Sequence, residues 1–238
     1  SYSVVKPQPE EPLISTELQS RYRMGVGMLL YLVKLSRPDI ANATRELTKV
    51  LEGATPGHYK AMLRTIKFVL ETEGLGLCLR PEMVKGNALF TFKGLCDSDY
   101  AGDKDTRISV YGFILYLCGA PISWRSKSGK SVTLSSTEAE FVSISEVAKE
   151  VIFVKQLLET IGINREYPIV VQVDNVGAIY LAYNHSLSQR TKHMSCRMAF
   201  VREFCEDGVL KVVFVSTLDN DADIFTKNTS QKVFEKHS

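Results

Sequence analysis

The order of predicted elements from residue 89 onward is the feature that most constrains what this chain can fold into. Three short runs of β-branched and aromatic residues predict three strands; a long helix, a buried strand, two helices, a fifth strand and a last helix follow. Strands and helices in this order need a sheet whose faces are covered by helices. We therefore predict an α/β fold with a mixed five-stranded sheet flanked by helices. The predicted strands are 89–92, 110–117, 121–124, 169–173 and 210–215, and the predicted helices are 137–161, 176–184, 192–207 and one that begins near Asp223.

The residues before the predicted sheet have a different character. They open with a polar, proline-rich stretch that is typical of a linker. Three helices are then predicted: one that stops before Pro38, one over 39–51, and one over 59–71 that Thr55 and Pro56 begin as N-cap and first-turn proline. The predicted organisation is a linker at 1–20, a helical segment at 21–80, a domain at 88–230 and a tail at 231–238.

Composition narrows the class of protein. The 238 residues include 29 basic and 27 acidic ones, and a net charge of +2 neither demands nor excludes a nucleic-acid partner. The five cysteines form no CxxC pair, so we expect free thiols in a reducing compartment, the cytoplasm. No apolar run approaches the roughly 18 residues that a membrane span needs, and the start is not a signal peptide. Because the sequence does not begin with Met, we expect a segment of a longer protein.

Glu140 occupies an unusual place on the predicted helix over 137–161. On a helical wheel with about 100° per residue, it lies in the middle of an apolar stripe that includes Ile144 and Val147. Glu138 lies on the opposite side, which we expect to be solvated. A carboxylate on a buried stripe is costly unless it is paired or binds a cation. Glu140 is therefore either held for a functional reason or reaches water at the helix end, and the wheel alone favours neither.

Three aspartates bear on this choice. Asp97 is predicted to end a strand segment at 94–97 and Asp174 to end the strand at 169–173, and Asp223 opens the final helix. Taken singly, each has an ordinary explanation as a turn former or an N-cap carboxylate. Together with Glu140 they place four acids on four neighbouring elements, at a sheet edge where ligands and catalytic groups gather. Such a cluster repels itself unless cations lie within it, and its oxygen ligands suit Mg²⁺ or Mn²⁺ rather than zinc.

Seven motifs in a fixed order carry a resemblance to a known family. They read CDSDYAGD at 96–103, TRISVYG at 106–112, ISWRSK at 122–127, SSTEAEF at 135–141, VDN at 173–175, RTKH at 190–193 and ADIFTK at 222–227. Together they closely resemble the RNase H region of copia-type LTR-retrotransposon Pol polyproteins, over roughly residues 89–227. The helices before this region are similar to the thumb or connection region of the same family's reverse transcriptase.

The resemblance implies an RNase H-like fold and a metal-dependent endoribonuclease that cuts the RNA strand of RNA–DNA hybrids. It implies two Mg²⁺ or Mn²⁺ ions, which activate a water and stabilise the departing oxygen. The sequence has no Tyr-x-Asp-Asp motif, so we expect the polymerase part of the same polyprotein to be a partner, in a virus-like particle if the element is active. The family's catalytic and metal-binding acids fall on Asp97, Glu140, Asp174 and Asp223.

This sequence departs from the family pattern in two motifs. Ser98 and Tyr100 stand where Ala and Trp are common, and these changes keep the acid. In the last motif Asn220 and Asp221 replace the usual Gln-Leu, and Asn228 stands where proline is typical. Asp219 and Asp221 are therefore rivals of Asp223 as the fourth ligand.

Several polar side chains near the acids are candidates for contact with the hybrid through phosphates and 2′-hydroxyl groups. The candidates are Arg107, Ser109, Arg125, Lys127, Asn175, Lys192 and His193. Lys130 belongs to the same basic turn as Arg125 and Lys127. For each of them an ordinary solvated side chain is an equal alternative, and His193 could instead shuttle a proton. Lys60, Arg64 and Lys67 either lie along the hybrid or cover a helical packing unit.

Two other functions compete with the nuclease. The altered last motif leaves open a non-catalytic nucleic-acid-binding or dimerisation module derived from a retroelement. A DNA-cutting relative with the same fold, such as an integrase or resolvase, is a further alternative, although the register of the seven motifs argues against it. The sequence does not determine the oligomeric state or the cleavage preference.

Overall fold

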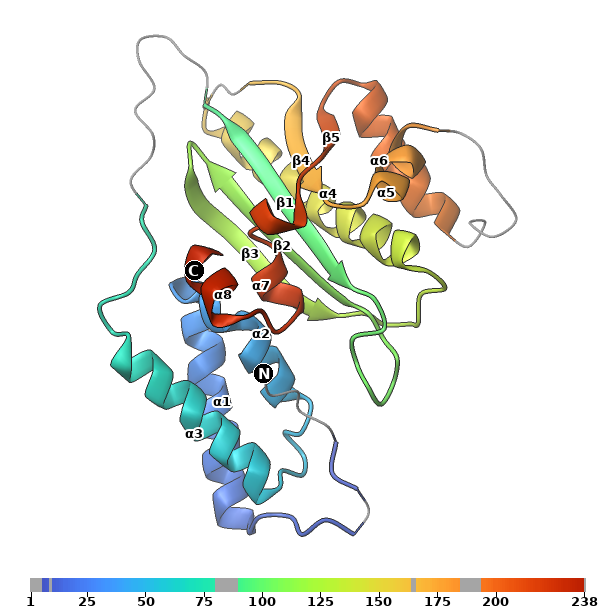
Figure 1. The fold of residues 1–238 in the computed structure, drawn as a ribbon. Coiled ribbons are helices and arrows are strands. Elements are labelled where there is room, and N and C mark those ends of the chain that lie inside the picture. The colour runs from blue at the N-terminus through green and yellow to red at the C-terminus, as the bar shows by residue number, and fades with distance from the viewer. Residues whose placement is uncertain (1–5, 9, 80–89, 164–165, 185–193, 238) are drawn as a thin grey trace.

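The structure is a computed structural model that describes residues 6–8, 10–79, 90–163, 166–184 and 194–237. Figure 1 shows a central sheet with helices on both faces and a group of helices from the first part of the chain below it. The elements are α1 (Thr16–Leu35), η1 (Pro38–Ile40), α2 (Ala41–Thr48), α3 (Pro56–Glu71), β1 (Phe92–Asp99), β2 (Val110–Leu117), β3 (Ala120–Ser128), α4 (Ser136–Thr160), β4 (Ile169–Val173), α5 (Val176–Tyr183), α6 (Ser195–Glu206), β5 (Leu210–Phe214), η3 (Thr217–Asp219), α7 (Asp223–Thr226) and α8 (Gln231–His237).

The strands form one mixed sheet in the order β3-β2-β1-β4-β5. β1, β2 and β3 form an antiparallel meander, whereas β4 lies parallel to β1 and β5 parallel to β4. Parallel strands need a crossover connection. The chain crosses from β3 to β4, beside β1, through α4, and it crosses from β4 to β5 through α5 and α6. This arrangement is RNase H-like and confirms the predicted fold class.

Helix α4 packs along one face of the sheet. The apolar stripe predicted for it is buried, with Ile144, Val147 and Val151 each 0% exposed. These side chains join Cys96 of β1 and Leu115 of β2 in the largest hydrophobic cluster, and α5 and α6 pack against the same cluster. The long helix is therefore fixed against the sheet along most of its length.

The opposite face is covered by α7 and by helices from the first part of the chain (Figure 1). Successive residues of a strand point to opposite faces, so Leu95 belongs to this second side. Leu95 packs there in a hydrophobic cluster with Ala41 of α2 and Phe225 of α7. Trp124 of β3 donates its indole N–H to the carbonyl oxygen of Val33 at 2.6 Å. The helical segment and the sheet thus share a buried contact surface.

Polar contacts strengthen this surface. The Arg45 guanidinium of α2 donates to the hydroxyl groups of Ser126 and Ser128 on β3 at 3.0 and 3.1 Å. Lys49, just after α2, pairs with Asp103 in the loop after β1 at 2.7 Å. Because these side chains are largely buried, their ion pairs and hydrogen bonds fix the register of α2 on the sheet.

Helices α1, α2 and α3 also have a hydrophobic cluster of their own. Tyr22 of α1 is 0% exposed, and its hydroxyl donates to the carbonyl oxygen of Leu47 at 2.8 Å. As predicted, α3 begins at the Thr55-Pro56 step, where Thr55 and His58 form a reciprocal capping box.

Several boundaries differ from the sequence predictions. The first strand was predicted at 89–92, but β1 runs from Phe92 to Asp99. Helix α1 begins at Thr16, because Ser15 caps it, so residues 16–20 are helical instead of part of a linker. Strand β3 continues to Ser128, and residues 231–237 form α8 instead of a tail. None of the helices in the described part of the chain combines the length and the apolar character that a membrane span requires.

Candidate metal centre

Strands β1 and β4 place two aspartates side by side. Asp97 lies within β1, which continues to Asp99, so the prediction that Asp97 ends its strand was wrong. Asp174 directly follows β4, as predicted. Since β1 and β4 are parallel neighbours, both carboxylates come to the same end of the sheet.

Helix α7 brings a third aspartate from the second face of the sheet. Gly112 of β2 is the register partner of Asp97. A Cβ atom at Gly112 would lie 2.6 Å from the Cβ of Phe225 and 2.8 Å from the Cγ2 of Thr226. The missing side chain therefore lets α7 rest directly on β2, which carries Asp223 to Asp97.

Asn220 fixes the loop before α7. It is 0% exposed, its amide donates to the carbonyl oxygen of Cys96 at 3.0 Å, and its Oδ1 accepts from the Ala222 N–H at 3.1 Å. A residue that departs from the family pattern is thus a structural anchor here.

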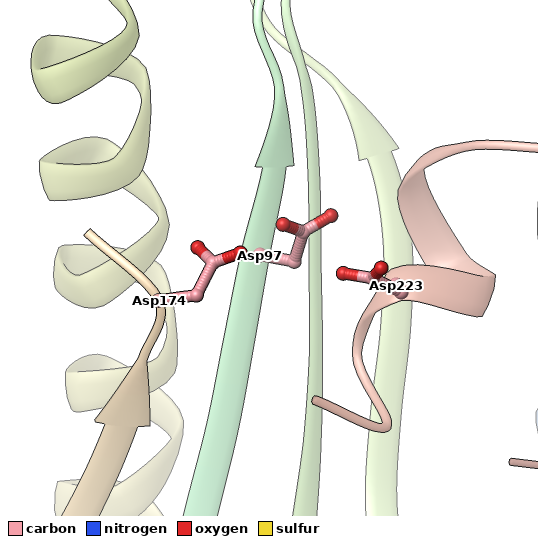
Figure 2. A group of neighbouring side chains, drawn as sticks. All are labelled: Asp97, Asp174 and Asp223. Carbon is pink, nitrogen blue, oxygen red and sulfur yellow. The ribbon is translucent and has the colours of Figure 1, made fainter. Parts of the chain in front are cut away.

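The three aspartates meet at one point. Figure 2 shows their carboxylates turned toward one another from β1, from the end of β4 and from α7. One carboxylate oxygen from each of Asp97, Asp174 and Asp223 lies within 4.8 Å of the others. Asp97 is 1% exposed and Asp223 4%, whereas Asp174 is partly exposed, so the group opens to solvent on the Asp174 side. A set of oxygen donors at this spacing could hold Mg²⁺ or Mn²⁺.

Glu140 lies beside this group and is not part of it. The side chain is 6% exposed, and its Oε1 accepts from the backbone N–H of Ser98 at 3.2 Å and from the Ser98 hydroxyl at 2.8 Å. Its other oxygen, Oε2, is buried and accepts no hydrogen bond from any residue that the structure describes. Buried carboxylate oxygens normally have a partner. A cation bound by the three aspartates would supply one, so the residues present fit a metal ion.

Burial disfavours the charged forms of these acids. It raises the pKa of Asp97 from 3.8 to about 7, with the charges of Asp223 and Asp174 adding to the effect. Burial, followed by the charge of Asp97, raises the pKa of Glu140 from 4.5 to about 8. The pKa of Asp223 is also raised by burial. A divalent cation would reverse these shifts, because it favours the ionised carboxylates.

The sequence reasoning missed two residues at the site. The Lys227 ammonium lies 3.0 Å from Asp223 Oδ1 and 3.4 Å from Asp97 Oδ1. The Thr226 hydroxyl donates to Asp97 Oδ2. Both belong to the last motif, and the four-residue spacing between Asp223 and Lys227 was the available signal, since i and i+4 side chains are neighbours on a helix.

The rival ligands lie outside the group. Asp221 accepts a hydrogen bond from the Tyr116 hydroxyl at 2.9 Å and contacts His237 Nδ1 at 2.7 Å. Asp219 is exposed and pairs with Lys236 at 2.8 Å. Among the described acids, Asp223 is therefore the one in this loop that reaches Asp97 and Asp174.

Glu138 was predicted to be solvated, and that prediction was wrong. It is 9% exposed, and its Oε2 accepts from the backbone N–H of Leu134 at 2.7 Å. The loop before α4 folds back over the first turn of the helix and covers a side that the wheel assigned to solvent.

The candidate nucleic-acid contacts differ in their accessibility. Arg107 is exposed in the loop before β2. Arg125 is exposed on β3, with its guanidinium 5.7 Å from the centre of the Phe113 ring. Asn175, beside Asp174, caps α5 by accepting from the backbone N–H of Ala178 at 3.0 Å.

Ser109 was expected to contact the hybrid, but it is 0% exposed, and its hydroxyl bonds to Thr133 at 2.7 Å and to the Ala101 N–H at 3.0 Å. It therefore orders the loops around it and presents no surface to a ligand. Lys192 and His193 lie outside the described residues.

A polar pocket of about 310 Å³ lies along α4, the helix that carries Glu140. Its lining includes Lys127 of β3, Lys130 of the following loop, Lys149 of α4 and Arg197 of α6. Glu146 lies among them and pairs with Lys149 at 2.9 Å and with Arg197 at 3.0 Å. Basic side chains outnumber the acids in this lining, which suits an anion such as a phosphate.

Comparisons with known proteins show which proteins this chain is similar to. No protein-family model matches the sequence. The retrovirus-related Pol polyprotein from transposon RE1 of Arabidopsis thaliana is 39% identical over 232 residues, covering 96% of this chain and 15% of that protein. The corresponding polyprotein from transposon TNT 1-94 of Nicotiana tabacum is 38% identical over 215 residues, covering 90% of this chain and 16% of that protein. The chain thus spans about 15% of the length of these polyproteins. Among solved structures, LC11-RNase H1 in complex with an RNA/DNA hybrid is 11% identical, with a TM-score of 0.43, over 57% of this chain and 94% of that chain.

Proposed function

Since the chain belongs to the Pol polyproteins of copia-type retrotransposons, as one region of them, we propose that it is a metal-dependent ribonuclease that cleaves the RNA strand of RNA–DNA hybrids. The observation that carries this proposal is the meeting of Asp97, Asp174 and Asp223, which come from three separate elements, within 4.8 Å. Burial raises the pKa values of two members of this cluster, which means that their charged forms destabilise the metal-free fold. An acid cluster of this kind at the end of an RNase H-like sheet therefore has no evident structural use.

The carboxylates of these aspartates would bind Mg²⁺ or Mn²⁺, and Glu140 would turn its free Oε2 toward the bound ions. When bound, two such ions would supply an activated water and would neutralise the charge that develops on the departing 3′ oxygen. The protein contributes a rigid set of oxygen donors, because Asp97 lies in a central strand and α7 is pressed against β2 by the glycine at position 112. A rigid set of donors would keep the ions, and through them the reacting phosphate, in place.

The pocket along α4 would bind a backbone phosphate of the hybrid. Lys127, Lys149 and Arg197 belong to three different elements and converge on it. Phosphate contacts of this kind position a duplex without reading its sequence. Arg107 and Arg125, which are exposed, would extend the basic surface, and the polymerase part of the same polyprotein would deliver the hybrid.

The test is a cleavage assay with labelled RNA–DNA hybrid, duplex DNA and duplex RNA, each with and without Mg²⁺. We expect Mg²⁺-dependent cutting of the hybrid alone. Asp97→Asn and Glu140→Gln are each expected to lower its rate by about 10³-fold or more. The matched control is Asp219→Asn, which removes an acid of the same loop region that lies outside the group and should leave the rate unchanged.

Each failure of this test has a distinct meaning. Cleavage by Asp97→Asn at the wild-type rate would remove the assignment of the site. Hybrid binding without cleavage by the wild-type protein would favour the non-catalytic nucleic-acid-binding module. Cutting of duplex DNA would indicate a nuclease of the integrase or resolvase kind.

A further inference from the structure

Lys227 holds a position that the proposed reaction does not explain. Its ammonium lies between two of the clustered acids, 3.0 Å from Asp223 Oδ1 and 3.4 Å from Asp97 Oδ1. The other oxygen of Asp97, Oδ2, accepts a hydrogen bond from the Thr226 hydroxyl. Both oxygens of Asp97 are therefore occupied by groups of the protein itself.

These two groups differ in how easily they can release Asp97. The Thr226 hydroxyl also lies 3.2 Å from the carbonyl oxygen of Asp223, so a rotation of the hydroxyl gives it another acceptor. Lys227 is held by charge, and a cation at its position repels any second cation that approaches the same oxygens. The ammonium group must move away before a metal ion can take both Asp97 and Asp223.

The structure leaves a path for this movement. The Lys227 side chain is 35% exposed, whereas the side chains of Asp97 and Asp223 are 1% and 6% exposed. Lysine is a compact charge on a flexible four-carbon stem. Its backbone follows the single turn of α7, so the stem can swing to solvent without disturbing the packing of Phe225 in the core.

We propose that Lys227 is a resident counter-ion of the acid cluster that divalent ions displace when they bind, so that it sets the metal concentration at which the site fills. Without metal, it neutralises part of the repulsion among the three clustered carboxylates. With metal, that role passes to the divalent ion, and the ammonium turns outward. This inference rests on the proposed function, because it takes the clustered acids to be metal ligands.

Mn²⁺ titration by isothermal calorimetry tests the proposal. We expect Lys227→Met to bind Mn²⁺ about tenfold more tightly than wild type or better, because a competing charge at contact distance is removed. Lys227→Arg, which keeps the charge, should bind close to wild type. The matched control is Lys236→Met, because Lys236 also pairs with an aspartate, Asp219, but lies outside the cluster; it should leave the affinity unchanged.

Thermal unfolding in a chelator gives a second readout. Lys227→Met should melt at a lower temperature than wild type without metal, and saturating Mn²⁺ should abolish the difference. If Lys227→Met fails to fold without metal, Lys227→Gln serves instead, because its amide can still donate to Asp97 while carrying no charge. Equal or weaker Mn²⁺ binding by the neutral variants overturns the proposal.

The same measurements separate this inference from the proposed function. Binding that is equal in wild type and Lys227→Met, together with metal-dependent cleavage, overturns the counter-ion and leaves the nuclease standing. Tighter binding by Lys227→Met without any hybrid cleavage supports the counter-ion and overturns the nuclease. If neither protein binds Mn²⁺, both fail.

Discussion

Replacing Asp97 with Asn is expected to separate the stability of the fold from the chemistry of the site. The variant should lose hybrid cleavage, yet in a chelator at pH 8 it should be more stable than wild type. The reason is that Asp97 is 1% exposed and burial works against its charge, whereas Asn has the same shape and no charge.

The magnitude follows from the pKa of Asp97, which is raised from 3.8 to about 7 in the folded protein. Each unit corresponds to about 1.4 kcal/mol, so ionised Asp97 destabilises the metal-free fold by on the order of 4 kcal/mol. This shift already includes the opposing attraction of Lys227. Because Asn keeps an acceptor for Thr226 and carries no charge, we expect a net gain of up to about 4 kcal/mol at pH 8.

The dependence on pH has a definite sign. Between pH 4 and pH 7 the folded protein holds a proton on Asp97 that the unfolded chain has released, so stability falls as the pH rises through this window. Glu140, with its pKa raised from 4.5 to about 8, extends the loss of stability to pH 8. The Asp97→Asn variant lacks the titration of Asp97, so its free energy of unfolding should depend less on pH.

Urea unfolding followed by circular dichroism, in a chelator at pH 5 and pH 8, measures both effects. Wild type should be less stable at pH 8 than at pH 5, with a smaller difference for Asp97→Asn. The control Asp219→Asn, at an exposed residue, should behave like wild type. An Asp97→Asn protein that is less stable than wild type at pH 8 would refute the reasoning, because it would show that the carboxylate is a net stabilising group without metal.

Two further variants test how the site is built. Gly112→Val should lower the melting temperature and abolish cleavage, while the circular dichroism of the sheet persists. The reason is that a side chain there collides with Phe225 and pushes α7 away. Retained activity would contradict the role given to this glycine. Ser98→Ala should move the rise of the cleavage pH profile to higher pH, because the Ser98 hydroxyl lowers the pKa of Glu140, and an unmoved profile would show that Glu140 does not titrate in the reaction.

Much of the fold could be predicted from local patterns. Strand and helix order, the stripe on α4 and the cap of α3 depend on neighbouring residues, and all of them were found as predicted. Boundaries were less predictable. The start of α1 at Thr16 depends on a single capping hydrogen bond, which the Ser15 hydroxyl accepts from the Leu18 N–H, and the length of β3 depends on its partners in β2.

The candidate site was harder to predict because it depends on contacts between distant residues. A wheel shows which side of a helix is apolar, so it indicated Glu140, but it cannot show a loop that folds back over Glu138. The choice of Asp223 over Asp221 also needed the structure, because the contacts of Asp221 with Tyr116 and His237 cannot be deduced from the sequence. Ser109 was misassigned because its hydroxyl is used inside the loops.

The second face of the sheet explains why the last motif reaches the acids at all. Helix α7 is a single turn, too short to be stable alone, and Phe225 holds it down by packing between the sheet and α2. Arg45 fixes α2 itself against β3 through Ser126. The position of Asp223 therefore depends on helices that lie more than a hundred residues before it in the sequence. If the helical segment and the RNase H-like domain are treated as separate units, the sequence still indicates the acids, but it does not indicate that α2 holds α7 in place.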